Sequence, residues 1–183
     1  MGALAVIQET PFPLEGFIQQ EPAAAVSILS SDLEASAGLI RESDPVLFPP
    51  ARVIYRLIYA DPALAAQLTI FLEEQGATDL VIESLAHFAY DKSRSEQVSG
   101  LPISLEKDGK FLESLLEQQG AGWLAQRLEE TFTEFDKRVE RGDIASDFLA
   151  HYQATLQASV ATLSDKETQK GLQQIIESLL PSF

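Results

Sequence analysis

Residues 116–139 read LEQQGAGWLAQRLEETFTEFDKRV, and this stretch decides the fold class of the chain. Its apolar side chains recur every three or four residues, at Leu124, Leu128, Phe132, Phe135 and Val139. Because an α-helix has about 3.6 residues per turn, this spacing places all of them on one face. The stretch therefore predicts a long amphipathic helix that begins just after Gly120.

The same spacing of apolar residues continues along most of the chain. It predicts helices near residues 22–40, 51–60, 62–75, 78–90, 105–119, 121–141, 143–163 and 165–180. Ser164 and Glu167 match a capping box at the start of the last of these helices. No stretch shows the sustained alternation that is typical of a strand. We therefore expect an all-α chain of about seven or eight helices, arranged as a bundle or as an array of αα-hairpins.

Proline and glycine indicate how the chain is divided. Pro11, Pro13 and Gly16 predict an extended N-terminal arm over residues 1–21. Three prolines make residues 43–50 a linker, and a polar run with glycine and proline predicts a loop at residues 91–104. The length of 183 residues suits one domain with a sizeable core. We expect a single helical domain over residues 22–183.

A hexamer occurs twice, as LEEQGA at residues 72–77 and as LEQQGA at residues 116–121. The similarity extends over residues 72–91 and 116–137. Each copy predicts a helix, a glycine and a second helix, because glycine readily adopts the left-handed conformation that closes many helices. Two interpretations stay open: a tandem pair of αα-hairpins, or an ordinary similarity between Gln- and Glu-rich helices that end in glycine. In both cases the motif concerns architecture and carries no chemistry.

The charge of the chain is strongly negative. Twenty-eight acidic residues face 13 basic ones, which gives −15, and residues 1–40 contain no Lys or Arg. Such a field repels phosphate backbones and anionic lipids, so we expect no nucleic-acid partner. It favours a protein partner with a basic or amphipathic segment. The alternative is that the acidic residues only keep a helical protein in solution.

Few residues suit catalysis or metal binding. The chain has no cysteine, and its two histidines are His87 and His151. Glu83 and His87 have a spacing of four residues that can bind a metal on one helical face, but the paired Glu-x-x-His motifs of a di-iron bundle are missing. Nucleophile elbows and phosphate-binding glycine loops are also missing. We therefore expect both histidines to be structural, and the chain to have no enzymatic activity, cofactor or metal.

One group of side chains is a candidate for binding a ligand or partner. Arg52 and Arg56 share a face of the segment ARVIYRLIYA and alternate with Tyr55 and Tyr59. Arginine beside tyrosine can clamp a carboxylate or stack on a planar group, although these arginines can equally pair with nearby acids. Trp123, the sole tryptophan, either anchors its hairpin or presents an aromatic ring to a partner.

These features lead to one functional hypothesis and one alternative. The first is a non-enzymatic protein-binding module, such as an adaptor, a regulatory protein or a dedicated assembly chaperone, with an acidic-rimmed helical surface. The alternative is a small-molecule sensor or carrier with an apolar cavity between helices. No run reaches about 18 apolar residues, so we expect no membrane span and a cytoplasmic location. Homo-oligomerisation is left open.

Overall fold

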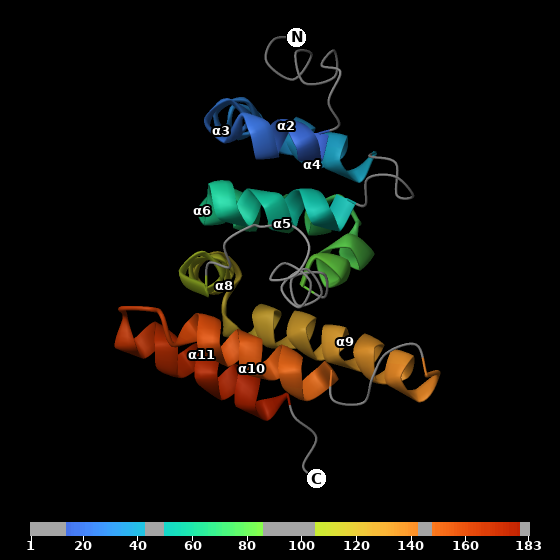
Figure 1. Ribbon diagram of the computed structural model, residues 1–183, viewed down its shortest axis with the longest axis vertical. Helices are drawn as coiled ribbons and strands as arrows, with labels where there is room; N and C mark the ends of the chain where they lie inside the picture. The colour runs from blue at the N-terminus through green and yellow to red at the C-terminus, as the bar shows by residue number, and fades with distance from the viewer. Residues whose placement is uncertain (1–13, 43–49, 86–104, 143–147, 180–183) are drawn as a thin grey trace. The chain divides into compact units, whose positions relative to one another are not determined.

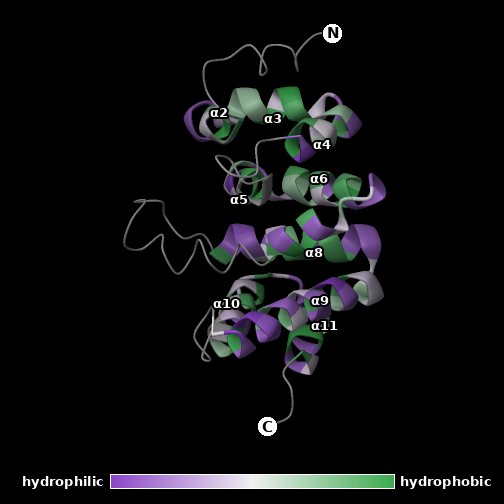
Figure 2. Cartoon of the chain, turned by 90° about the vertical axis from the view of Figure 1, so that its right-hand side faces the viewer, coloured by the Kyte–Doolittle hydropathy of each residue, from purple (hydrophilic) through white to green (hydrophobic). Residues whose placement is uncertain are grey.

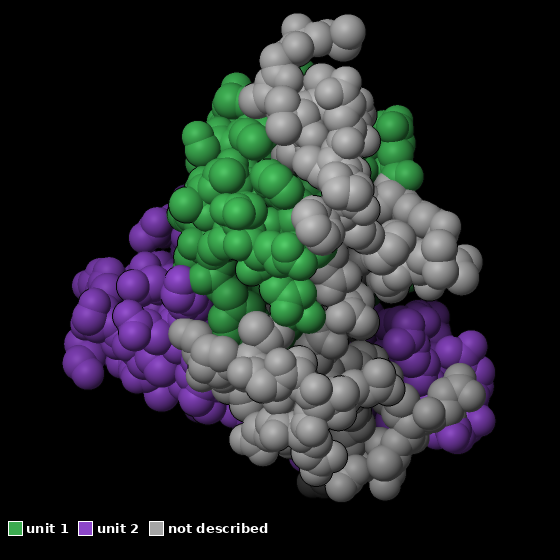
Figure 3. Space-filling view, turned by 45° about the horizontal axis from the view of Figure 1, so that its top comes forward, with its two compact units in different colours: residues 1–87 green, residues 88–183 purple. Residues whose placement is uncertain are grey.

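The computed structural model describes residues 14–42, 50–85, 105–142 and 148–179. Within these ranges the regular elements are all helices, which confirms the predicted fold class (Figure 1). The chain divides into two compact units, residues 1–87 and residues 88–183, which are coloured separately in Figure 3. Each unit is described by itself, and the single helical domain expected over residues 22–183 stays a prediction.

Unit 1, residues 1–87, is built around one central helix. Its helices are α2 (Leu14–Gln20), α3 (Pro22–Ser30), α4 (Leu33–Arg41), α5 (Pro50–Ala60) and α6 (Pro62–Glu74), and residues 78–85 are also helical. Helix α5 packs against α2, α3, α4 and α6. Val53, Ile54, Leu57 and Ile58 of α5 are at most 1% exposed. Burial of these side chains contributes to the hydrophobic stabilisation of the unit.

Asp61 and Pro62 define the boundary between α5 and α6. The Asp61 carboxylate accepts a hydrogen bond from the Leu64 backbone N–H at 3.1 Å. Pro62 occupies the first turn, where the missing N–H of proline carries no penalty. Side-chain capping and proline together stop one helix and start the next within two residues.

The prediction of an extended arm over residues 1–21 needs a correction. Residues 1–13 lie outside the described part of the chain, whereas Leu14–Gln20 forms helix α2. The physical reason is tertiary packing. Phe17 and Ile18 are 9% and 2% exposed, and their helix packs against α3 and α5. Burial of these two side chains favours a helix of only two turns, which is too short to be stable in isolation.

The helix predicted over residues 22–40 is also wrong, because this stretch forms the two helices α3 and α4. The Asp32 carboxylate accepts from the Ala35 N–H at 3.1 Å and so caps the second helix. Ser31 Oγ donates to the Ile28 carbonyl at 2.6 Å, which satisfies a carbonyl at the end of the first. This break and α2 bring the described part of the chain to ten helical segments, two more than the eight ranges predicted.

Helix α3 has an apolar composition. Figure 2 shows that α3 consists mostly of apolar and weakly polar residues. Within the described residues, no single helix has both the length and the apolar character needed to cross a membrane. The α3–α4 pair reaches that length and composition only together, with a bend of 114° between the two helices.

Unit 2, residues 88–183, contains four described helices: α8 (Leu105–Gln119), α9 (Ala121–Glu140), α10 (Phe148–Val160) and α11 (Lys166–Ser178). The 20-residue helix α9 confirms the long amphipathic helix predicted from its apolar spacing. Helix α10 packs against α8, α9 and α11. Tyr152 of α10 is fully buried, with its ring centroid 5.2 Å from that of Phe132 and 5.1 Å from that of Phe135. These aromatic rings form the centre of the unit 2 core.

The capping box predicted at Ser164 is wrong by one residue. The N-cap of α11 is Asp165, whose carboxylate accepts from the Glu167 N–H at 3.1 Å and from Thr168 Oγ1 at 3.0 Å. Ser164 is exposed and precedes the cap. A carboxylate at this position satisfies an N–H of the first turn and also interacts favourably with the positive end of the helix dipole.

Helix α8 lies close to the backbone of α10 at Gly109. A Cβ atom added there would lie nearer to the Ser159 carbonyl oxygen than Cβ atoms are found in proteins, and 2.9 Å from Thr162 Oγ1. Thr162 Oγ1 in turn donates to the Ser159 carbonyl at 2.7 Å. Gly109 therefore sets how closely the two helices pack.

The two copies of the hexamer end their first helices differently. Gly76 has a φ of +84°; its N–H donates to the Glu73 carbonyl and the Ala77 N–H donates to the Leu72 carbonyl, both at 2.9 Å. This pair of bonds is a Schellman motif, as the sequence predicts for a helix that closes on glycine.

Gly120, the glycine of the second copy, has a different conformation from Gly76. Its φ of 88° and ψ of 167° make it the N-cap of α9 rather than a left-handed helix end. This region of backbone conformation is essentially restricted to glycine. The two hexamers therefore share a helix–glycine–helix order but have different turns, which favours ordinary similarity over a duplicated hairpin.

This difference gives a testable contrast between Gly76→Asn and Gly120→Asn. Asparagine tolerates the left-handed helical conformation, so Gly76→Asn is expected to lower the free energy of unfolding by less than about 1 kcal/mol. Gly120→Asn is expected to lower it by about 2 kcal/mol, because that backbone conformation excludes side chains. Thermal unfolding followed by far-UV circular dichroism measures both. Equal losses, or the opposite order, would contradict the two assigned turns.

Candidate functional site

The candidate residues of α5 lie in a helix that packs against four other helices of unit 1. Tyr55 is 2% exposed, and its hydroxyl lies 2.9 Å from the hydroxyl of half-buried Tyr59. Their rings meet edge to face, with centroids 5.2 Å apart. The structure thus brings these two tyrosines together as a partly buried polar pair at i, i+4. Arg52 belongs to α5, but its side chain lies outside the described part of the structure.

Arg56 is the described arginine of this group. Its side chain is half-buried, and its Nη1 atom is buried. Tyr55 is buried in a helix that packs against four neighbouring helices of unit 1. A partner protein at the surface could not reach Tyr55 in this conformation. The binding role assigned to Arg52, Tyr55, Arg56 and Tyr59 stays a prediction.

A third arginine of unit 1 has a structural role that the sequence did not indicate. Arg41 Nη1 donates to the Gln75 carbonyl at the C-cap of α6, at 3.3 Å. Gln75 Nε2 donates in return to the Glu34 carbonyl at 2.9 Å. These two hydrogen bonds join α4 to the end of α6. The glutamine of the first hexamer therefore connects two helices, whereas its counterpart Gln119 is exposed.

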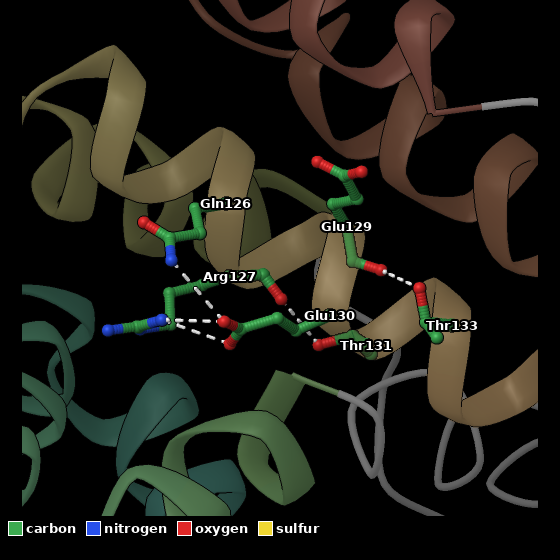
Figure 4. A network of polar contacts seen from close by, with 6 residues as sticks. All are labelled: Gln126, Arg127, Glu129, Glu130, Thr131 and Thr133. Atoms are coloured by element: carbon green, nitrogen blue, oxygen red, sulfur yellow. Dashed lines mark hydrogen bonds and ion pairs between the residues drawn. The ribbon is translucent and has the colours of Figure 1, made fainter.

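Trp123 lies in unit 2, in the first turn of α9, and is half-buried. The guanidinium carbon of Arg127 lies 5.7 Å from the centroid of its ring, which is within the range of a cation–π interaction. Arg127 Nη1 also donates to both carboxylate oxygens of Glu130, at 2.9 and 3.1 Å (Figure 4). The arginine side chain is only 12% exposed. These contacts favour the anchoring role for Trp123, although presentation to a partner is not thereby tested.

The solvent-facing side of α9 is the surface that sequence reasoning missed. Exposed residues recur along it at three- and four-residue spacing, namely Gln126, Glu129, Thr133, Asp136 and Glu140. We call Glu129, Asp136 and Glu140 the acidic stripe. Thr133 Oγ1 donates back to the Glu129 carbonyl at 2.9 Å, so this hydroxyl is turned toward the helix backbone (Figure 4). The sequence allowed this surface to be predicted, because the exposed positions lie on the side of the helix opposite the apolar positions.

Two ion pairs on α9 involve glutamates that lie beside the acidic stripe. Glu130 pairs with Arg127, and a carboxylate oxygen of Glu134 forms an ion pair with Arg138 Nε at 3.7 Å. Both are local contacts at i, i+3 or i, i+4, which partly neutralise carboxylates beside the stripe. Exposed Lys137 is a positive charge next to Asp136. The stripe therefore presents three exposed carboxylates over about three helical turns.

A second electrostatic feature lies on α8. Burial raises the pKa of the Glu113 carboxyl above its ordinary value of 4.5, and the negative charges of Glu117 and Asp165 raise it further. Lys110 acts in the opposite direction, and it also forms an ion pair with Glu106 at 3.2 Å. The charged form of Glu113 therefore opposes folding at neutral pH, and this penalty disappears as the pH falls through its folded-state pKa.

Glu113→Gln is accordingly expected to raise the midpoint of thermal unfolding at pH 7 by about 1–2 °C, since like charges at i, i+4 destabilise a helix by about 0.2–0.5 kcal/mol. The gain should vanish near pH 4, where the carboxyl of the wild type is protonated. Glu106→Gln is the matched control and should lower the midpoint slightly, because it removes an ion pair. An equal gain from Glu113→Gln at both pH values would contradict the electrostatic origin.

The described residues contain no group of three or more His, Asp or Glu side chains arranged to hold a metal ion. The side chains of His87 and His151 lie outside the described part of the structure, so their expected structural role is untested. Burial raises the pKa of the Tyr152 phenol, which therefore stays protonated in the core. Tyr152 is best understood as a packing residue.

Comparison with known proteins gives no independent indication of function. The sequence matches no family model, and no match is found among curated proteins or solved structures. Function is therefore inferred from the residues of the chain itself. Among the described residues, the acidic stripe of α9 is the surface from which a function is inferred.

Proposed function

We propose that the chain is a non-enzymatic protein-binding module, an adaptor or dedicated assembly chaperone, that binds a basic or amphipathic segment of a partner protein. The observation that carries the proposal is the acidic stripe. Glu129, Asp136 and Glu140 are exposed along one side of a single 20-residue helix. A partner helix with Lys or Arg at the same three- and four-residue spacing can place several charges opposite these carboxylates.

The overall charge supports the same proposal. The chain carries 28 acidic and 13 basic residues, a net charge of −15. A negative field of this kind attracts a basic partner over a distance of about a Debye length, near 10 Å at moderate salt. The field increases the association rate, and local contacts with the stripe provide specificity. Both effects weaken as salt concentration rises.

The test compares two variants with the same change of net charge. In one, the stripe is neutralised by Glu129→Gln, Asp136→Asn and Glu140→Gln. In the control, Glu74→Gln, Asp79→Asn and Glu83→Gln neutralise three exposed carboxylates of unit 1. If each exposed ion pair contributes about 0.5 kcal/mol, loss of the stripe weakens binding about tenfold. Affinity capture from native lysate with quantitative mass spectrometry, followed by titration of the recovered partner, measures this change.

The outcome for the control variant separates a specific surface from a general charge effect. We expect the control to retain nearly all of its partner at about 0.1 M salt, a concentration at which distant charges are already screened. The stripe variant should lose most of it. Equal losses would mean that net charge alone attracts the partner. If the stripe variant retained its partner fully, α9 would not be the binding surface.

A second candidate function, a small-molecule carrier, is favoured by one observation. Arg56 of α5 is half-buried and lies beside the apolar core residues Leu57 and Ile58 in the chain, and a guanidinium can bind a carboxylate at the edge of an apolar site. Native mass spectrometry of the purified protein distinguishes the two functions. A small ligand that copurifies with the wild type, and is lost in Arg56→Met, supports the carrier. A bare mass in both supports the protein-binding module.

A further inference from the structure

We draw no further inference here: the strongest candidate, the exposed small-residue face of α3 in unit 1, formed by Ala23, Ala24, Ser27 and Ser30, carries nothing because nothing in the structure shows what covers it.

Discussion

Phe135→Ala is expected to lower the free energy of unfolding by about 3–5 kcal/mol, the range for large-to-small substitutions of buried aromatic residues. Phe135 is fully buried, and its ring meets that of Tyr152 edge to face with centroids 5.1 Å apart. Alanine removes this contact and leaves a cavity between α9 and α10. Because tightly packed cores relax only partly, the neighbouring side chains are not expected to fill it.

Unfolding of unit 2 can be followed through the fluorescence of Trp123, the sole tryptophan of the chain. Thr133→Ala is the matched control, because Thr133 is exposed on the same helix and should change stability by no more than about 0.5 kcal/mol. If Phe135→Ala and Thr133→Ala unfolded at the same denaturant concentration, Phe135 would not be a core residue.

Gly109→Ala is expected to lower the free energy of unfolding by about 2 kcal/mol through overpacking. The added methyl group would collide with the Ser159 carbonyl oxygen, a backbone atom that cannot move without shifting the end of α10. This cost exceeds the gain of about 0.5–1 kcal/mol that alanine normally brings in a helix interior. The substitution should therefore destabilise unit 2 although it improves helix propensity.

Gly171→Ala is the control, and it is expected to change the free energy of unfolding in the opposite direction. Gly171 lies inside α11, and a Cβ added there meets no other atom within 4 Å. Only the helix propensity changes, so this variant should be stabilised by about 0.5–1 kcal/mol. Trp123 fluorescence against denaturant gives both values. If Gly109→Ala gained stability as Gly171→Ala is expected to, the close approach of α8 and α10 would be refuted.

The fold class and most helix positions could be predicted because they depend on local patterns. The apolar spacing of α9 is a local pattern, since it repeats every three or four residues. The Asp61–Pro62 cap of α6 is also local, because Asp61 bonds to a backbone N–H only three residues away. Helix α2 could not be recognised in this way, since it depends on burial of Phe17 and Ile18 against distant segments. The break at Asp32 was missed because the apolar spacing continues across it, and capping prevails over that spacing.

The candidate site was less predictable, because composition does not show which face of a helix is buried. The segment that contains Tyr55 and Arg56 has the residues of a binding surface, yet four neighbouring helices enclose it. The sequence alone cannot reveal those neighbours. The exposed side of α9, in contrast, follows directly from its apolar side and could have been derived from the sequence. Attention to residue types that bind ligands, rather than to helix faces, led the prediction to α5.

Carbodiimide cross-linking of the captured complex is the most direct test of the proposed function. This reagent joins a carboxylate to an amine only where the two are in contact, so it reports ion pairs between this chain and lysines of a partner. The account predicts cross-links from Glu129, Asp136 or Glu140 to lysines within one short basic segment, and their loss in the stripe variant. A complex whose intermolecular cross-links all avoid α9 would contradict it.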